Sequence, residues 1–183
     1  MMKHEETVNI GLINPKDAQN VGSILRAMGC YQGDKVYYTG NRYAYALRHN
    51  TDTQKASELI DVVKVEDLIS TVKEQLIPDT KIVCVELVEG ATPLPEFKHP
   101  DHAFYIFGPE DGNIGQKIIN QADEVVYVPT IGCMNLAATA NVVLYDRLAK
   151  SRRSKELIAH GNELIRNSRD GNNHLKVRSK KGA

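Results

Sequence analysis

The sequence predicts an α/β protein with one parallel β-sheet flanked by helices on both faces. Three observations support this prediction. Short runs of β-branched and apolar residues recur along the 183 residues, helical patterns separate them, and no repeat or low-complexity linker divides the chain. A chain of this length buries about 70% of its unfolded surface on folding, so one self-supporting domain is expected.

The strands are expected where short apolar runs end at turn residues. Each run is rich in Val, Ile, Tyr or Phe and is too short to form a typical helix. The predicted strands cover residues 7–13, 35–40, 62–65, 81–87, 103–108 and 124–129. Their alternation with helical segments favours parallel pairing.

The helices are expected in the intervals, where apolar residues recur at a spacing of about 3.6. The predicted helices cover Val21 to Met28, 66–76, 113–121, 135–150 and, from the segment LIAHGNELI, 157–165. The polar remainder of the chain is rich in Gly and Asn and is expected to fray.

The cysteines and apolar segments limit the class of protein. Cys30, Cys84 and Cys133 are far apart and form no CxxC pair, so reduced thiols are expected, with no structural zinc or other metal. No apolar stretch reaches the roughly 18 residues of a membrane span, and the N-terminus has no signal-peptide core. We therefore expect a cytoplasmic protein without a membrane partner.

The zero net charge conceals a division along the chain. Residues 1–146 hold 12 Lys and Arg against 20 Asp and Glu, a balance of −8, whereas residues 147–183 hold 11 against 3, a balance of +8. A basic tail is typical of nucleic-acid binding by counterion release, and it is equally typical of a solvated end of a chain.

Functional residues are expected after the strands, because parallel sheets bind ligands at the carboxyl ends of their strands. Three junctions are informative, namely 14–29, 107–115 and 126–146. None contains GxGxxG or GxxxxGK[ST], which disfavours nicotinamide, flavin and nucleoside triphosphate sites.

The first junction, NPKDAQNVGSILRAMG, places polar residues on a helix. Asp17 is a candidate N-cap, and Asn20 follows in the first turn. Arg26 lies six residues later and therefore about 240° around the helix, so it serves a different neighbour. An arginine at the edge of a helix, or one paired with a carboxylate, is the plain alternative to a functional role.

The second junction, FGPEDGNIG, carries Glu110 and Asp111 between two glycines. Gly108 and Gly112 allow the backbone to approach a ligand closely, although an ordinary exposed turn has the same composition.

The third junction, VPTIGCMNLAATA, leads into the longest predicted helix. A buried amide needs partners, so Asn135 must cap this helix, brace a neighbouring loop or contact a ligand. The small residues 137–140 suggest close packing against another backbone.

Together, the three junctions resemble the motifs of the SPOUT superfamily, in its TrmH-like (SpoU) branch of RNA ribose 2′-O-methyltransferases. The matching patterns are N-x5-N-x5-R, then F-G-P-E-D-G-N-I, then V-P-x-x-G-x-M-N-L-A. The resemblance covers the chain from Val8 to about Arg153.

The resemblance implies a methyltransferase domain over 1–153, with a deep trefoil knot at about 84–145, and a helix with a basic tail over 154–183. It also implies that S-adenosylmethionine (AdoMet) binds in the loops of the knot. The residues that match the cofactor loops are Glu86, Leu87, Val88, Gly108, Val128, Gly132, Cys133 and Met134.

The resemblance assigns catalytic roles to four residues. Arg26 is expected to contact an RNA phosphate and the ribose hydroxyl, Asn20 and Glu110 to orient Arg26 and the loops, and Asn135 to hold the cofactor and substrate sides together. Many members have Ser where this chain has Cys133, which we expect to be a small buried side chain.

The resemblance also implies a homodimer that binds RNA, with tRNA favoured over rRNA. The face of the long helix formed by residues 137–140, Val142 and Val143 is expected in the dimer interface. Tyr43 and Tyr45 either stack bases or pack on their own loop. The basic residues expected to bind RNA are Arg42, Arg48, His49, Arg152 and Arg153.

Two other functions are consistent with the residues. A knotted RNA-binding protein with little methyl transfer would retain the same loops, and the neutral net charge and Cys133 favour it. A nucleotide-dependent enzyme of flavodoxin-like fold would share the sheet, and it would bind ATP or FMN instead of AdoMet.

Overall fold

The computed structural model describes residues 6–48 and 60–177. The chain forms two compact units, Met1–Lys150 and Ser151–Ala183, which are described separately. The first unit contains the sheet and all three junctions.

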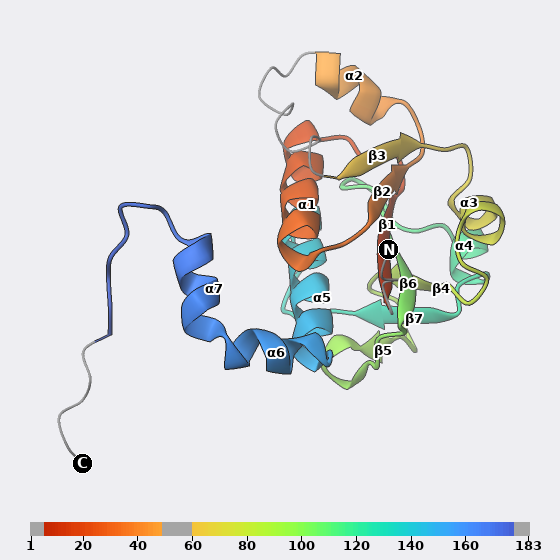
Figure 1. Ribbon diagram of the computed structural model, residues 1–183. Coiled ribbons are helices and arrows are strands. Elements are labelled where there is room, and N and C mark those ends of the chain that lie inside the picture. The colour runs from red at the N-terminus through yellow and green to blue at the C-terminus, as the bar shows by residue number, and fades with distance from the viewer. Residues whose placement is uncertain (1–5, 49–59, 178–183) are drawn as a thin grey trace. The chain divides into compact units, whose positions relative to one another are not determined.

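The first unit is built on a parallel sheet. Within the described residues seven strands pair in the order β3-β2-β1-β6-β4-β7-β5, and every neighbouring pair is parallel. The strands are β1 (Thr7–Leu12), β2 (Lys35–Tyr38), β3 (Asp61–Lys64), β4 (Lys81–Val85), β5 (Thr92–Pro93), β6 (His102–Phe107) and β7 (Glu124–Tyr127). β6 is inserted between β1 and β4, which brings the end of β6 beside the end of β1 (Figure 1).

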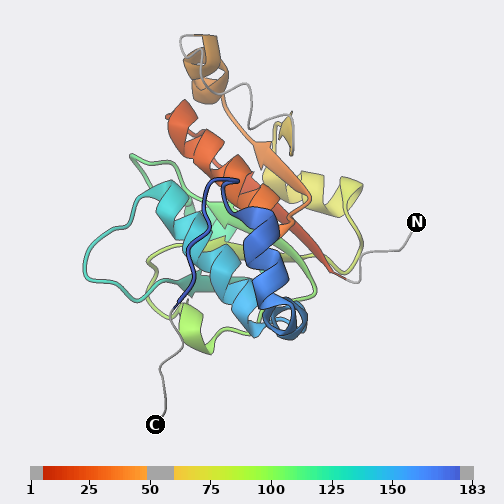
Figure 2. The ribbon, with the colours of Figure 1, turned by 60° about the vertical axis from the view of Figure 1, so that its left-hand side comes forward.

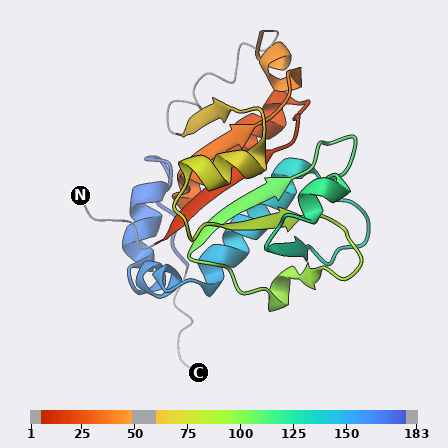
Figure 3. The same cartoon turned by 90° about the vertical axis from the view of Figure 1, so that its right-hand side faces the viewer.

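Helices cover both faces of this sheet. α1 (Ala18–Tyr31) and α5 (Leu136–Lys150) lie side by side on one face, as Figures 1 and 2 show. α3 (Leu68–Gln75) and α4 (Gln116–Ile119) lie on the other face, which is turned toward the viewer in Figure 3. Two short helices, α2 (Arg42–Arg48) and η1 (Leu94–Glu96), lie in connections between strands.

The alternation of side chains along β6 divides the core into two layers. Tyr105 and Phe107 pack in the layer beneath α1 and α5, whereas Phe104 and Ile106 pack in the layer beneath α3. All four are essentially inaccessible to solvent. Burying side chains of this size contributes about 1.5–3 kcal/mol each, and a central strand buried on both faces explains the continuous apolar run in the sequence.

The end of α5 is tied to the segment that precedes β6. Arg147, which is 6% exposed, donates to the carbonyl oxygens of Pro100 (2.5 Å) and Asp101 (2.9 Å). Lys150 Nζ donates to the carbonyls of Leu94 (2.6 Å) and Phe97 (3.1 Å). The two cations therefore supply charged donors to carbonyl groups that are partly buried beneath the helix.

A buried histidine, His99, also links α5 to β6. His99 Nε2 lies 2.9 Å from Asp146 Oδ2, and its Nδ1 lies 2.6 Å from the Tyr105 hydroxyl. Burial lowers the pKa of His99 despite the neighbouring Asp146, so the ring is neutral at pH 7. The neutral ring can donate to Asp146 and accept from Tyr105, which satisfies both nitrogens.

The predicted α/β class, the parallel sheet and the helices on both faces are confirmed, and so are the six predicted strands. The single helix predicted for residues 157–165 is wrong, because the chain breaks at His160 into α6 (Arg153–Ala159) and α7 (Gly161–Ser168). The helix α2 was not predicted. It buries Tyr43 at 4% exposure against Tyr38, so the suggested base stacking by Tyr43 is wrong.

Candidate functional site

A pocket of about 320 Å³ opens at the carboxyl ends of β4, β6 and β7, where two of the three junctions meet the start of α1. Its volume lies at the lower end of the range for small-molecule sites. The lining is formed by Asn20, Val85, Glu86, Leu87, Phe107, Gly108, Pro109, Glu110, Gly112, Asn113, Tyr127, Val128, Thr130, Gly132, Cys133, Met134, Asn135, Leu136 and Thr139.

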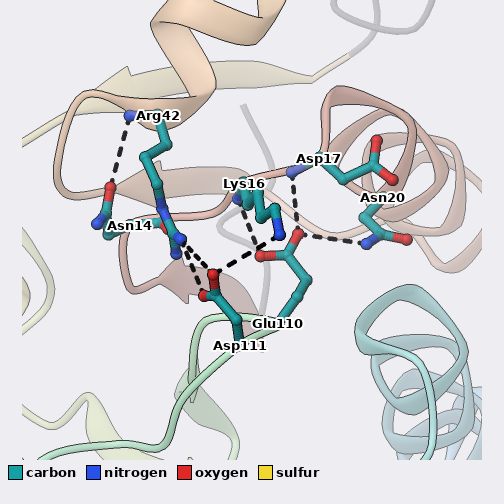
Figure 4. Close-up of polar contacts among 7 residues, drawn as sticks. All are labelled: Asn14, Lys16, Asp17, Asn20, Arg42, Glu110 and Asp111. Carbon is teal, nitrogen blue, oxygen red and sulfur yellow. Dashed lines mark hydrogen bonds and ion pairs between the residues drawn. The ribbon is translucent and has the colours of Figure 1, made fainter.

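Glu110 connects the loop after β6 to the start of α1 (Figure 4). Its two oxygens accept hydrogen bonds from the backbone N–H groups of Lys16 (2.9 Å) and Asp17 (3.1 Å) and from Asn20 Nδ2 (3.2 Å). Partial burial alone would raise the pKa of Glu110, but these donors outweigh it and hold the pKa below its ordinary value. The carboxylate is therefore charged at neutral pH and serves as an acceptor.

A second contact links the same asparagine to the third junction. Asn135 Nδ2 donates to Asn20 Oδ1 at 3.0 Å. Asn135 Oδ1 accepts from the N–H groups of Ala137 (2.8 Å) and Ala138 (3.2 Å) at the start of α5. Asn135 therefore both caps its helix and braces the neighbouring junction, which are two of the three roles that the sequence left open.

The chemistry at the two ends fixes the direction of this hydrogen-bond relay, which runs from Glu110 through Asn20 and Asn135 to α5. Glu110 can only accept, so Asn20 must present its amide nitrogen to it and its oxygen to Asn135. The helix N–H groups can only donate, so Asn135 must present its oxygen to them and its nitrogen to Asn20. Both central positions therefore need a side chain that donates and accepts at once, as an amide does.

Glu86 fixes the loop after β4 to the loop after β6. Its Oε2 accepts from Ile114 N–H at 3.0 Å, and its Oε1 accepts from Leu87 N–H at 2.9 Å. The close approach also favours a glycine, because a Cβ at Gly108 would lie 3.2 Å from both Glu86 Oε2 and Ile114 N, which is tighter than an ordinary van der Waals contact.

The loop after β7 makes a tight turn, which is held by a hydrogen bond between Thr130 and the backbone. Thr130 Oγ1 donates to the carbonyl of Gly132 at 3.0 Å, and Gly132 has φ +85°, a conformation that favours glycine. Both carboxylates of the pocket lining, Glu86 and Glu110, are engaged by N–H groups of the protein. The described lining therefore offers a ligand mainly main-chain groups and apolar side chains.

The structure brings most of the predicted site residues together. Asn20, Glu110 and Asn135 line the pocket and bond to one another as described above. Val88 lies outside it, in the turn in which Ala91 N–H donates to Val88 O. The predicted cofactor residues that line the pocket are Glu86, Leu87, Gly108, Val128, Gly132, Cys133 and Met134.

Arg26 lies apart from the pocket of its own chain. It is exposed on α1 and has no hydrogen-bond or ion-pair partner among the described residues. Asn20 and Glu110 were expected to orient Arg26, but neither contacts Arg26 within the described residues. Nor does any carboxylate among residues 6–48 and 60–177 pair with Arg26, so the structure gives no support to the alternative of a core ion pair.

Cys133 is exposed, so the expectation of a buried side chain is wrong. It precedes Asn135 in a loop whose tip, Ile131, is fully exposed. Loop residues at the mouth of a pocket have no core to fill, which is why small size alone did not predict burial.

The residues predicted to bind RNA are divided by the structure. Arg42 bonds to Asn14 and Asp111 near the pocket (Figure 4), and Tyr45 is 66% exposed. The side chain of Arg48 and all of His49 lie outside the described residues. Arg152 and Arg153 belong to the second unit.

Several pocket residues were not predicted. Phe107 and Tyr127 are the last residues of β6 and β7, so their position at the carboxyl edge was a usable signal. Asn113 belongs to the quoted pattern F-G-P-E-D-G-N-I, so the motif was its signal, whereas Thr139 lies inside a helix and carried none.

The family model described as "SpoU rRNA Methylase family" matches residues 7–145, which is most of the chain and includes the first two junctions and all but the last residue of the third. The chain belongs to the SpoU rRNA methylase family. The family resemblance predicted from the three motifs is therefore confirmed, and this member is an RNA methyltransferase by family. A search of curated proteins found no match to the chain.

Solved structures share the fold of this SpoU family member. A TrmH/SpoU tRNA modifying enzyme from A. aeolicus is 17% identical, with a TM-score of 0.67 over 84% of this chain and 79% of that one. The SpoU methyltransferase AviRb from Streptomyces viridochromogenes, in complex with AdoMet, is 17% identical, with a TM-score of 0.65 over 84% and 60%.

A third structure, described by "the 2-OH methylation of C/U34 on tRNA", is 17% identical, with a TM-score of 0.64 over 80% of this chain and 97% of that one. In the described part of this SpoU protein, no helix is long and apolar enough to cross a membrane. The same residues contain no group of three or more His, Cys, Asp or Glu side chains placed to hold a metal ion.

Proposed function

We propose that this protein transfers a methyl group from AdoMet to a ribose 2′-hydroxyl of tRNA. The observation that carries the proposal is the single pocket formed by the loops after β4, β6 and β7, joined by the contacts of Glu86 and the relay from Glu110 to α5. Family membership supports methyl transfer to RNA, and AdoMet occupies the structure of the related AviRb.

The lining fits AdoMet chemically. The loops that match the cofactor motifs present backbone groups suited to adenine and to the amino-acid arm, and apolar side chains such as Leu87 and Val128 surround them. AdoMet, when bound, supplies a methyl group on a positively charged sulfur. The charged carboxylates of Glu86 and Glu110 give the site a complementary negative potential.

Methyl transfer of this kind is an in-line displacement, so the main task of the protein is alignment. The relay fixes the start of α1 against the start of α5 and so holds the cofactor side and the substrate side at a constant separation. Arg26 then serves the RNA by pairing with a phosphate and lowering the cost of negative charge on the attacking oxygen.

We infer that the protein is a homodimer in which Arg26 acts on the pocket of the partner subunit. Arg26 is exposed and outside its own pocket, as a residue completing a second site would be. The exposed stripe of α5 formed by Ala138, Val142 and Tyr145 supports an interface. Of the face expected in the interface, Ala137, Ala140 and Val143 are buried in their own core, whereas Ala138 and Val142 are exposed and remain available to a partner.

We infer that the segment from about Cys84 to Tyr145 forms the trefoil knot of the family. The contacts of Arg147 and Lys150 with the carbonyls of residues 94–101 support a C-terminal helix enclosed by the preceding loop. An experimental structure in which α5 passes outside that loop would contradict the presence of a knot. The boundary near Arg153 and an RNA-binding role for the basic tail, including Arg152, are part of the same proposal.

The preference for tRNA over rRNA has two supports. Two of the similar structures are described as acting on tRNA, and one of them is covered over 97% of its length. The test is incubation of the protein with methyl-tritiated AdoMet and either unfractionated tRNA or rRNA, followed by digestion to nucleosides. Label is expected in 2′-O-methylated nucleosides of tRNA.

The possible outcomes separate the alternatives. Label on a base, or only in rRNA, would contradict the proposed product or substrate. Binding of AdoMet and tRNA without transfer would favour an RNA-binding protein. Affinity for ATP or FMN without affinity for AdoMet, measured by calorimetry, would favour a nucleotide-dependent enzyme.

A further inference from the structure

Two cationic side chains share one carboxylate beside the pocket (Figure 4). Arg42 Nη1 donates to both oxygens of Asp111 at 2.8 Å, and Lys16 Nζ lies 3.7 Å from Asp111 Oδ2. Asp111 directly follows Glu110, whose side chain lines the pocket, so this cluster lies at its rim. The side chains of Lys16, Arg42 and Asp111 have no part in the relay, although the backbone N–H of Lys16 donates to Glu110.

Arg42 is held in place without Asp111. Its Nε and Nη2 both donate to the carbonyl oxygen of Asn14, at 3.0 Å and 2.6 Å. These two bonds orient the plane of the guanidinium and leave Nη1 directed toward the carboxylate. If Asp111 moved away, the arginine would keep its position and present free donors at the same point.

Asp111, in contrast, can leave without loosening the loop. Its side chain is 48% exposed and, among the described residues, pairs only with Arg42 and Lys16. The neighbouring Glu110 and the more distant Glu86 hold the loop through backbone N–H groups. A half-exposed ion pair adds little to stability, so its exchange for another anion is not prevented by the fold.

We propose that Lys16 and Arg42 form a binding site for a phosphate of the RNA backbone, and that the Asp111 carboxylate occupies this site when RNA is not bound. The proposal rests on the proposed function, since it takes RNA as the substrate. A phosphate offers the same pair of acceptor oxygens as a carboxylate and carries at least as much charge. A nucleotide entering the pocket brings its own phosphates to the rim, where the two cations lie.

Asp111 then acts as a competitor. It neutralises the cations in the free protein and must be displaced by the phosphate, which lowers the affinity for RNA in general and favours RNA that also fills the pocket. The arrangement predicts a gain in RNA affinity larger than a change in net charge alone would give, because loss of the Asp111 charge frees two cations at once.

The test is a double-mutant cycle with Asp111→Asn and Arg42→Gln, in which affinity for unfractionated tRNA is measured by fluorescence anisotropy at several salt concentrations. D111N is expected to tighten binding about 3- to 10-fold. Adding R42Q to D111N is expected to weaken binding about 10-fold and to lower the salt slope by about 0.7–1. Lys16→Gln in the D111N background is expected to act in the same direction and provides an independent second variant.

The matched control is Asp61→Asn, which makes the same charge change in the exposed pair of Lys35 and Asp61, at the amino ends of β2 and β3. It is expected to change tRNA affinity less than about 2-fold. Affinity for AdoMet, measured by calorimetry, should be the same in all variants and shows that the loop and pocket are intact.

Any of four results would overturn the proposal. If the pair only braces the loop, D111N weakens tRNA binding and R42Q adds nothing in the D111N background. If D111N and D61N tighten binding equally, the effect is one of net charge alone. If the wild-type protein transfers methyl groups but the cycle shows no coupling, the phosphate site is rejected and the proposed function stands. A wild-type protein that neither binds nor methylates tRNA rejects both.

Discussion

Replacing Arg26 with alanine is expected to lower the rate of methyl transfer by a factor of about 100 or more while leaving AdoMet affinity unchanged. Arg26 is exposed, lies outside the pocket lining and has no partner among the described residues, so its loss removes no cofactor contact. For the same reason the free energy of unfolding should change by no more than about 0.5 kcal/mol. Single-turnover transfer to tRNA and calorimetry with AdoMet measure the two quantities.

Arg26→Lys is the matched control, because it keeps the charge and loses the fork of donors that binds a phosphate bidentately. It should recover only a small part of the rate. An R26A protein that keeps most of its rate would remove Arg26 from the mechanism.

Mixing subunits tests where Arg26 acts. If it completes the site of the partner, heterodimers of R26A with a pocket variant contain one intact site, and a random mixture should recover about one quarter of wild-type activity. No recovery would place Arg26 in its own subunit's site, or show that the protein does not work as a dimer.

Replacing Asn135 with alanine is expected to produce the second-largest effect, because it removes a helix cap and a contact between junctions together. Loss of the cap should cost about 1 kcal/mol of stability, and loss of the bond to Asn20 should lower transfer about 10- to 100-fold by misplacing the two sides of the site. Urea denaturation and initial rates of transfer measure the two effects.

Asn135→Asp separates the two roles. A carboxylate can still accept from the N–H groups of Ala137 and Ala138, so the cap survives, but it cannot donate to Asn20. Stability should therefore stay near that of the wild type while transfer falls almost as far as in N135A. Full activity in N135D would show that the relay does not position the site.

The sequence was sufficient to predict the class of fold and the location of the site. Each long strand is recognisable in the sequence as a short apolar run. Because the carboxyl ends of parallel strands lie at the same edge of the sheet, the loops that contain Glu110 and Asn135 were expected there. The relay could not be predicted, because Asn20 and Asn135 are 115 residues apart. Their contact depends on the insertion of β6 between β1 and β4, which local patterns do not encode.

Two other features depended on tertiary contacts. The helix α2 has only seven residues, and burial of Tyr43 against Tyr38 stabilises it, whereas its sequence resembles an exposed loop. Arg42 and Asp111 are 69 residues apart, so the family resemblance could suggest Arg42 as an RNA-binding cation, but the sequence could not show that Asp111 pairs with it.

The central claim is that the loops after β4, β6 and β7 form one pocket for AdoMet, and hydrogen–deuterium exchange tests it most directly. Adding AdoMet is expected to slow amide exchange together in residues 86–90, 108–114 and 128–135, with no comparable change in α3 on the opposite face. Protection of only one of these loops, or protection elsewhere in the chain, would contradict the claim.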